Sequence, residues 1–125
     1  MSLCLTLALA LIGADVARCE SSARYDDGAV VLRVALNRAR DWRRPLWRVL
    51  TQPRQFAHFC PLQARPFSWR HVQLGWAMAR GTLQAPAWSL EARFYCGPSD
   101  TQERCHKRRY GAAGAIVHVF YRGSR

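Results

Sequence analysis

The N-terminal part of the chain contains a twelve-residue apolar stretch, Leu3 to Ala14, and no apolar stretch in the sequence is longer. A helix that crosses a bilayer needs about 20 apolar residues, so a conventional membrane protein is not expected. Apolar residues recur in and just beyond this stretch at steps of three and four, at Leu5, Ala8, Leu9, Ile12 and Val16. This spacing predicts a helix with one buried stripe.

The apolar segment, residues 1–14, has a second interpretation as part of a secretory signal peptide. Its apolar region would be Leu3–Gly13, with a cleavage site at Ala8–Ala10 or near Ala14. No Lys or Arg precedes this region, although signal peptides normally begin with positive charge. We therefore favour a first helix over about Leu3–Cys19, with Glu20 at or just past its C-terminal end.

The sequence predicts a single domain. Its 125 residues are a one-domain length, and no repeat or linker divides residues 1–125. Half of the residues are apolar or aromatic, which excludes an intrinsically disordered chain. Further helices are expected over Gly28–Ala39, Pro45–Leu50 and Trp69–Leu83, and strands over Ala92–Cys96 and Ala115–Tyr121. The chain should therefore be mainly helical, with a small C-terminal β-hairpin or sheet.

Two of these helices have a predicted inward face. In the first, the inward residues are Val30, Val31, Val34 and Ala35; in the second they are Val72, Trp76, Ala79 and Leu83. Between the helices, Gln52–Ser68 is rich in proline and aromatic residues and has no clean period. Irregular segments of this kind carry functional sites more often than they carry cores.

The charge of the chain restricts its partners. Nineteen basic residues face eight acidic ones, giving a net charge of +11, and Lys107 alone among the basic residues is not Arg. Such a field attracts polyanions, among them nucleic acid, anionic lipid and the bacterial cell wall. A GC-rich genome would also favour Arg over Lys, but it explains the imbalance of charge less well.

The five cysteines form no Cys-x-x-Cys pair, so a zinc ribbon is not expected. Cys96 and Cys105 flank a short loop and suit a disulfide in an oxidising compartment, whereas the alternative is five free thiols. We favour the Cys96–Cys105 bridge. The four histidines show no metal-ligand spacing, and we expect neither a metal nor an organic cofactor.

Glu20 stands apart from the other acidic residues, most of which lie in loop-like contexts. It follows an apolar helix, and a carboxyl group held against an apolar wall has a raised pKa. Such a group can serve as the proton donor of a glycosidase. The alternative is an ordinary solvated glutamate at a helix end. His118, in the last strand, is likewise either a half-buried structural histidine or a residue facing a cleft.

Five short motifs occur in an order that resembles the SleB-type cell-wall hydrolases, which include spore-cortex-lytic enzymes and phage lysins. They are Glu20 after Ala17-Arg18, Val34-Ala35-Leu36-Asn37-Arg38, Gln52-Pro53-Arg54-Gln55-Phe56, Phe94-Tyr95 and His118-Val119-Phe120-Tyr121. The family pattern has a "valNR" helix, a "QpgQFs" loop, an aromatic strand and a final His-x-Phe-Tyr. The chain departs from it after Glu20, at Ala57 and in the basic Cys96–Cys105 loop.

This resemblance implies a lysozyme-like α+β fold and cleavage of the MurNAc–GlcNAc β-1,4 bond of peptidoglycan by a lytic transglycosylase or muramidase. Glu20 would be the single general acid and base. The substrate-binding residues carried over from the pattern are Asn37, Gln55, Phe56, Tyr95, His118 and Tyr121, and Trp69 and Trp76 are further aromatic candidates for stacking on sugars.

The implied partners are glycan strands and anionic wall polymers. The implied place of action is the periplasm or cell wall, reached by export or by phage-mediated delivery. The alternative is that the protein is associated with the virion. The oligomeric state stays open. The alternatives are a basic nucleic-acid-binding module, for which no motif is present, and a non-catalytic wall-binding or virion structural protein.

Overall fold

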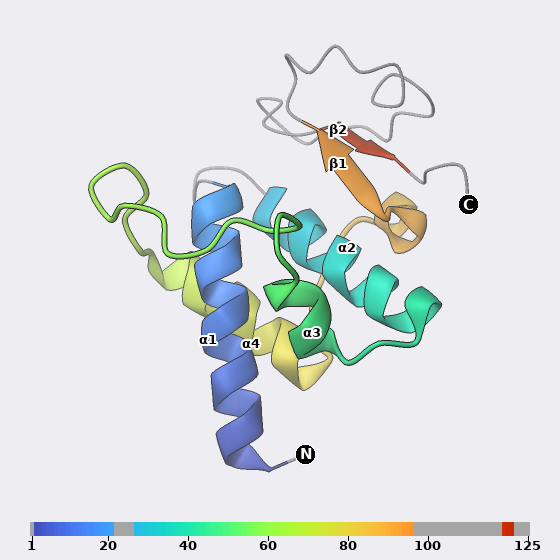
Figure 1. The fold of residues 1–125 in the computed structure, drawn as a ribbon, viewed down its shortest axis with the longest axis horizontal. Coiled ribbons are helices and arrows are strands. Elements are labelled where there is room, and N and C mark those ends of the chain that lie inside the picture. The colour runs from blue at the N-terminus through green and yellow to red at the C-terminus, as the bar shows by residue number, and fades with distance from the viewer. Residues whose placement is uncertain (1, 22–26, 97–118, 122–125) are drawn as a thin grey trace.

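The computed structural model describes residues 2–21, 27–96 and 119–121, and this part of the chain is mostly helical (Figure 1). Its elements are α1 (Leu3–Glu20), α2 (Asp27–Trp42), α3 (Leu46–Thr51), α4 (Trp69–Arg80), the 3₁₀-helix η1 (Ala87–Glu91), β1 (Phe94–Cys96) and β2 (Val119–Tyr121). The mainly helical prediction is confirmed. No helix in the described ranges is long and apolar enough to cross a membrane.

The two strands form a small antiparallel sheet in which Phe94 pairs with Tyr121 and Tyr95 with Phe120. Both lie inside the ranges predicted as strands. The preceding 3₁₀-helix, η1, was not predicted, and Pro86 stands immediately before it. The amide of Asn37 on α2 holds this helix by donating to the backbone carbonyls of Ser89 and Ala92, both at 2.8 Å.

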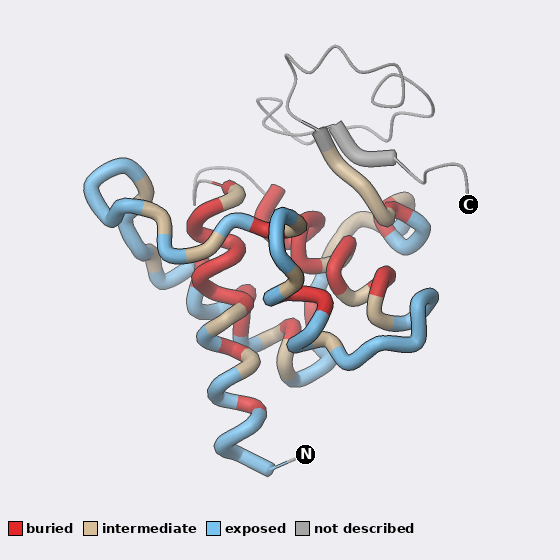
Figure 2. The backbone as a smooth tube through the Cα atoms, in the orientation of Figure 1, coloured by how far each residue is buried: buried red, intermediate tan, exposed pale blue. Residues whose placement is uncertain are grey.

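The core lies where α1, α2 and α4 pack together, with α3 closing one side (Figure 2). The inward face predicted for α2 is confirmed, because Val30, Val31, Val34 and Ala35 are all buried. Val16 of α1 and Leu50 of α3 are buried against the same core. Apolar burial of this extent is what holds the helices together.

The helices α1 and α4 cross in close contact at two glycines. A Cβ atom at Gly75 would meet the Ala10 carbonyl oxygen and, at 2.6 Å, the Ala14 backbone nitrogen. A Cβ atom at Gly13 would lie 2.6 Å from the Met78 methyl carbon. The two backbones can approach this closely only because neither position carries a side chain.

This close crossing explains why the predicted faces of α1 and α4 are only partly correct. On α1, Val16 is buried and Leu9 and Ile12 pack against the core as predicted, but Leu5 and Ala8 are exposed and the other buried residues are mostly small.

On α4 the buried residues are His71, Leu74, Gly75 and Met78, whereas Val72 and Trp76 are 38% and 36% exposed; Leu83, just after the helix, is buried as predicted. Counting large apolar residues includes exposed positions when two helices meet through small residues.

We predict that Gly75→Ala destabilises the fold by about 2 kcal/mol, because overpacking against a backbone outweighs the gain in helix propensity. The control is Gly81→Ala, at a position with φ of +74° and nothing within 4 Å of a Cβ atom. Backbone strain alone should cost about 1 kcal/mol there. Urea unfolding measures both, and a stabilised Gly75→Ala protein would contradict the close crossing.

Candidate active site

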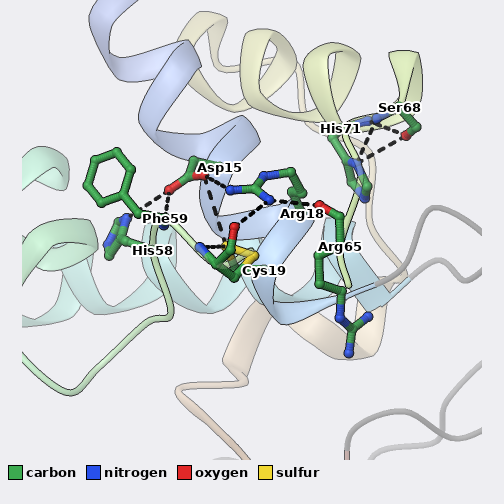
Figure 3. A network of polar contacts seen from close by, with 9 residues as sticks. Asp15, Arg18, Cys19, His58, Phe59, Arg65, Ser68 and His71 are labelled. Carbon is green, nitrogen blue, oxygen red and sulfur yellow. Dashed lines mark hydrogen bonds and ion pairs between the residues drawn. A yellow bond between two sulfur atoms is a disulfide. The ribbon is translucent and has the colours of Figure 1, made fainter. Parts of the chain in front are cut away.

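The irregular segment 52–68 is attached to the last turns of α1 by a buried arginine (Figure 3). One Arg18 nitrogen, Nη1, donates to the backbone carbonyls of Cys60 at 3.0 Å and Arg65 at 2.7 Å. Its Nη2 donates to Asp15 at 2.7 Å, and the guanidinium lies 4.4 Å from the centre of the Phe67 ring. Arg18 therefore organises the segment rather than meeting solvent.

Asp15 completes this attachment, and the sequence analysis did not single it out. Its Oδ2 accepts a hydrogen bond from the Phe59 backbone N–H at 2.9 Å and lies 3.6 Å from His58 Nδ1. His58 Nε2 in turn lies 2.6 Å from the Leu50 carbonyl oxygen. The available signal was a lone carboxylate in an apolar helix, three residues before an arginine on the same face.

A disulfide ties the same two parts of the chain together. Cys19 and Cys60 are bridged across a sequence separation of 41, with their Cα atoms 5.6 Å apart. The alternative of five free thiols is therefore wrong, and this pairing was not predicted. The favoured Cys96–Cys105 bridge cannot be followed, since Cys105 lies outside the described residues. Cys4 is free and exposed.

Glu20 is the last residue of α1 and is half-buried. Its Oε1 accepts a hydrogen bond from the Ala57 backbone N–H at 2.5 Å. The Tyr95 side chain reaches the same carboxyl group from β1 and is hydrogen-bonded to it. Burial raises the pKa of Tyr95 far above its ordinary value, and the negative charge of Glu20 and this hydrogen bond raise it further. Tyr95 is thus a neutral donor at physiological pH.

Arg38, buried on α2, binds residues that lie two positions before Tyr95 and Ala57, both partners of Glu20. Its Nε donates to the Arg93 carbonyl at 2.6 Å and its Nη1 donates to Gln55 Oε1 at 3.1 Å. Its guanidinium lies 5.1 Å from the centre of the Phe56 ring. The positive charge of Arg38 acts against the other causes and lowers the pKa of Tyr95. Arg38 belongs to the second motif, but it was not among the predicted site residues.

The structure brings four predicted site residues together, namely Glu20, Gln55, Phe56 and Tyr95. Phe56 is buried in the core beside Tyr95, with 6.1 Å between the ring centres, so it is a packing residue and not an accessible stacking surface. Asn37 is only 1% exposed and its amide holds η1, so the expected sugar contact is not available to it either.

The remaining predicted sugar-binding residues are not shown to contact Glu20. His118 lies outside the described residues, and of Tyr121 the structure describes the backbone in β2. Trp69, in the first turn of α4, is exposed, and Trp76 is partly exposed.

Two residues of the irregular segment 52–68 have left-handed backbone conformations. Arg54 has a φ of +64° and Phe59 a φ of +51°. Such a conformation costs roughly 1–2 kcal/mol in a residue other than glycine. Arg54 stands where the "QpgQFs" pattern has its glycine, so the loop keeps the turn that glycine would accept without strain. Backbone strain of this kind concentrates at functional sites.

A separate open pocket of about 480 Å³ lies beside the middle of α1. It is lined by Leu11, Ile12, Asp15, Thr51, His58 and Phe59, and its walls are mostly apolar. Glu20 does not line it. The pocket, which Asp15 lines, and the contacts of Glu20 are therefore two different features.

Among the described residues, no group of His, Cys, Asp and Glu side chains is arranged to hold a metal ion. Comparisons with models of protein families, with curated proteins and with solved structures find no match to this chain. The candidate site therefore rests on its own geometry, which is a half-buried carboxyl group held by one backbone N–H and one tyrosine hydroxyl.

A buried histidine joins the end of α1 to the start of α4. His71 Nδ1 accepts from the Ser68 backbone N–H at 3.2 Å, and Nε2 lies 3.2 Å from the Ser21 carbonyl oxygen, which fits the neutral Nε2–H form. Burial lowers the pKa of His71, and the charges of Arg18 and Arg65 lower it further, against the opposing effect of the Ser21 hydrogen bond.

Because the folded pKa of His71 is lowered, the stability that its neutral form contributes is complete above the unfolded value of 6.5 and is lost as the pH falls below it. His71→Gln keeps a capping-box partner for Ser68 but does not titrate. We predict that the stability of the wild type falls more steeply than that of His71→Gln as the pH is lowered. Urea unfolding across this range measures it, with His58→Gln as the control that retains His71. Parallel curves would contradict this assignment.

We also predict that Cys19→Ser combined with Cys60→Ser lowers the free energy of unfolding by about 4 kcal/mol, the chain-entropy value for a loop of 41 residues. Cys4→Ser, at an exposed free cysteine, should change it by less than about 0.5 kcal/mol. Chemical denaturation of the three proteins provides the comparison. Equal midpoints for all three would show that the bridge does not constrain the fold.

Proposed function

We propose that this chain cleaves the MurNAc–GlcNAc β-1,4 bond of peptidoglycan, with Glu20 as its single general acid and base, on a fold related to lysozyme. The observation that carries the proposal is that Tyr95 and the Ala57 backbone N–H both bind the half-buried carboxyl group of Glu20, while Gln55, two residues before Ala57, binds the neighbouring Arg38. Glu20, Gln55 and Tyr95 come from three separate motifs of the resemblance. A mostly helical body with a small sheet is compatible with such a fold.

In the proposed reaction, Glu20 first donates its proton to the glycosidic oxygen as the bond from that oxygen to the muramyl C1 breaks. The muramyl 6-hydroxyl oxygen then forms a bond to C1, and its proton returns to Glu20. The products are a 1,6-anhydro-muramyl end and a free GlcNAc 4-hydroxyl. Water in place of the 6-hydroxyl gives an ordinary reducing end, as in a muramidase.

The state of Asp15 supports a mechanism with one carboxyl group. It is the other buried carboxylate of α1, and its two oxygens are engaged by Arg18 Nη2 and by the Phe59 backbone N–H. A retaining or inverting glycosidase needs a second carboxylate near the scissile bond. A residue held in this way is better suited to fixing the loop than to activating a nucleophile.

The place of action follows from two features. The Cys19–Cys60 disulfide is typical of proteins in oxidising compartments, such as the bacterial periplasm. The net charge of +11 favours adsorption to anionic wall polymers. We therefore propose the periplasm or cell wall, reached by export or phage delivery, as the site of action, with glycan strands as the substrate and no specific role for nucleic acid.

The deciding experiment is digestion of purified sacculi by wild type and by Glu20→Gln. We predict that the substitution lowers the rate by at least about a hundredfold, since it removes the acid and base while keeping the shape of the side chain. Glu91→Gln, at an exposed residue in η1, is the charge-matched control and should keep wild-type activity.

Mass spectrometry of the released muropeptides distinguishes the products, because an anhydro end is lighter than a reducing end by one water. Sacculi that are bound but left intact by the wild type would instead identify a non-catalytic wall-binding protein. Full activity in Glu20→Gln would refute the assigned role of this residue.

A further inference from the structure

The N-terminal half of α1, Leu3–Leu11, is apolar and largely exposed, with Thr6 and Ala10 as its buried residues. It projects beyond the other helices (Figure 1), and Figure 2 colours most of it as exposed. Leu3, Leu7 and Leu11 are all exposed and are spaced four residues apart, so they form one strip along the helix. Exposed apolar surfaces of this kind mark sites of interaction.

The exposed half-helix is apolar on more than one side. Leu5 is also exposed, and its position two residues from Leu3 and Leu7 places it across the helix from the strip. No residue from Ser2 to Ala14 carries a charge at neutral pH, and Asp15 is the first that does. Thr6 and Ala10 are buried on the remaining side. A protein groove or a second copy would cover one exposed side of the helix, whereas lipid covers every exposed side.

At its Leu11 end, the strip of leucines adjoins a surface that also contains aromatic and basic side chains. Leu11 lines the apolar pocket together with Thr51 and the highly exposed Phe59. Trp47 lies one helical turn before Thr51, hence on the same side of α3, and is exposed with the Arg48 guanidinium 5.3 Å from its ring centre. Tryptophan and arginine at the border of an apolar surface are typical of the water–membrane boundary.

The dimensions of the half-helix fit one leaflet. At 1.5 Å per residue, the helix from Leu3 to Leu11 extends about 12 Å, close to the thickness of one leaflet, which is half of a hydrocarbon core of about 30 Å. The net charge of +11 complements anionic headgroups. We propose that the N-terminal half of α1 inserts into one leaflet of an anionic membrane, with Trp47 and Arg48 at the level of the headgroups. This inference stands independently of the proposed cleavage reaction.

The test is co-sedimentation with vesicles of phosphatidylcholine alone and of phosphatidylcholine with phosphatidylglycerol. Leu7→Asn with Leu11→Asn removes two leucines that are 46% and 69% exposed; the matched control, Leu62→Asn with Leu90→Asn, removes two that are 61% and 49% exposed. We expect the wild type and the control to bind the anionic vesicles, and the α1 variant to bind about a hundredfold more weakly.

A fluorophore on Cys4 reports insertion directly. We expect its emission to shift to shorter wavelength and to resist an aqueous quencher on anionic vesicles, with labelled Cys4→Ser protein as the background. Failure of the wild type to bind, or equal binding by the α1 variant, overturns the proposal. So does concentration-dependent self-association that only the α1 variant abolishes, because the occupant is then a second copy of the chain.

Discussion

The approach of α1 to α4 at Gly13 and Gly75 is the constraint on which the rest of the structure depends. The two backbones touch there, with Ala10 and Ala14 as the neighbouring contacts. This crossing fixes the rotation of α1 about its own axis. It therefore determines which side chains of its last turns face the irregular segment, and where the carboxyl group at its end lies. It also leaves Leu3, Leu5, Leu7 and Leu11 exposed to solvent.

The type and position of most elements could be predicted from the sequence, because each has a local cause. Apolar periodicity is clear in α2, and Pro45 and Pro53 bracket α3. The faces of α1 and α4 could be predicted only in part. Glycine and alanine make the closest contacts between them and carry little hydrophobic signal, so Leu5 and Trp76 entered the predicted faces although they lie outside the core.

In the candidate site, too, some residues could be predicted from local sequence and others could not. Glu20, Gln55 and Tyr95 were found because short motifs mark them, but the roles of the residues that position them could not be predicted. Arg18 stands in the first motif and Asp15 in none, and both bind backbone groups more than 40 residues away in sequence. Charged residues at buried positions become informative only when their distant acceptors are known.

These hidden contacts account for how the site is held. A buried guanidinium is costly unless its donors are satisfied, and Arg18 meets two carbonyls, a carboxylate and an aromatic ring. Asp15, Arg18 and Cys19 each bind residues 59–65, and all three precede Glu20 by five residues or fewer. Because the loop is attached to the turn that carries the carboxyl group, the Ala57 N–H is held beside Glu20. The end of α1 therefore fixes the loop against the carboxyl group, and β1 adds Tyr95 from the other part of the fold.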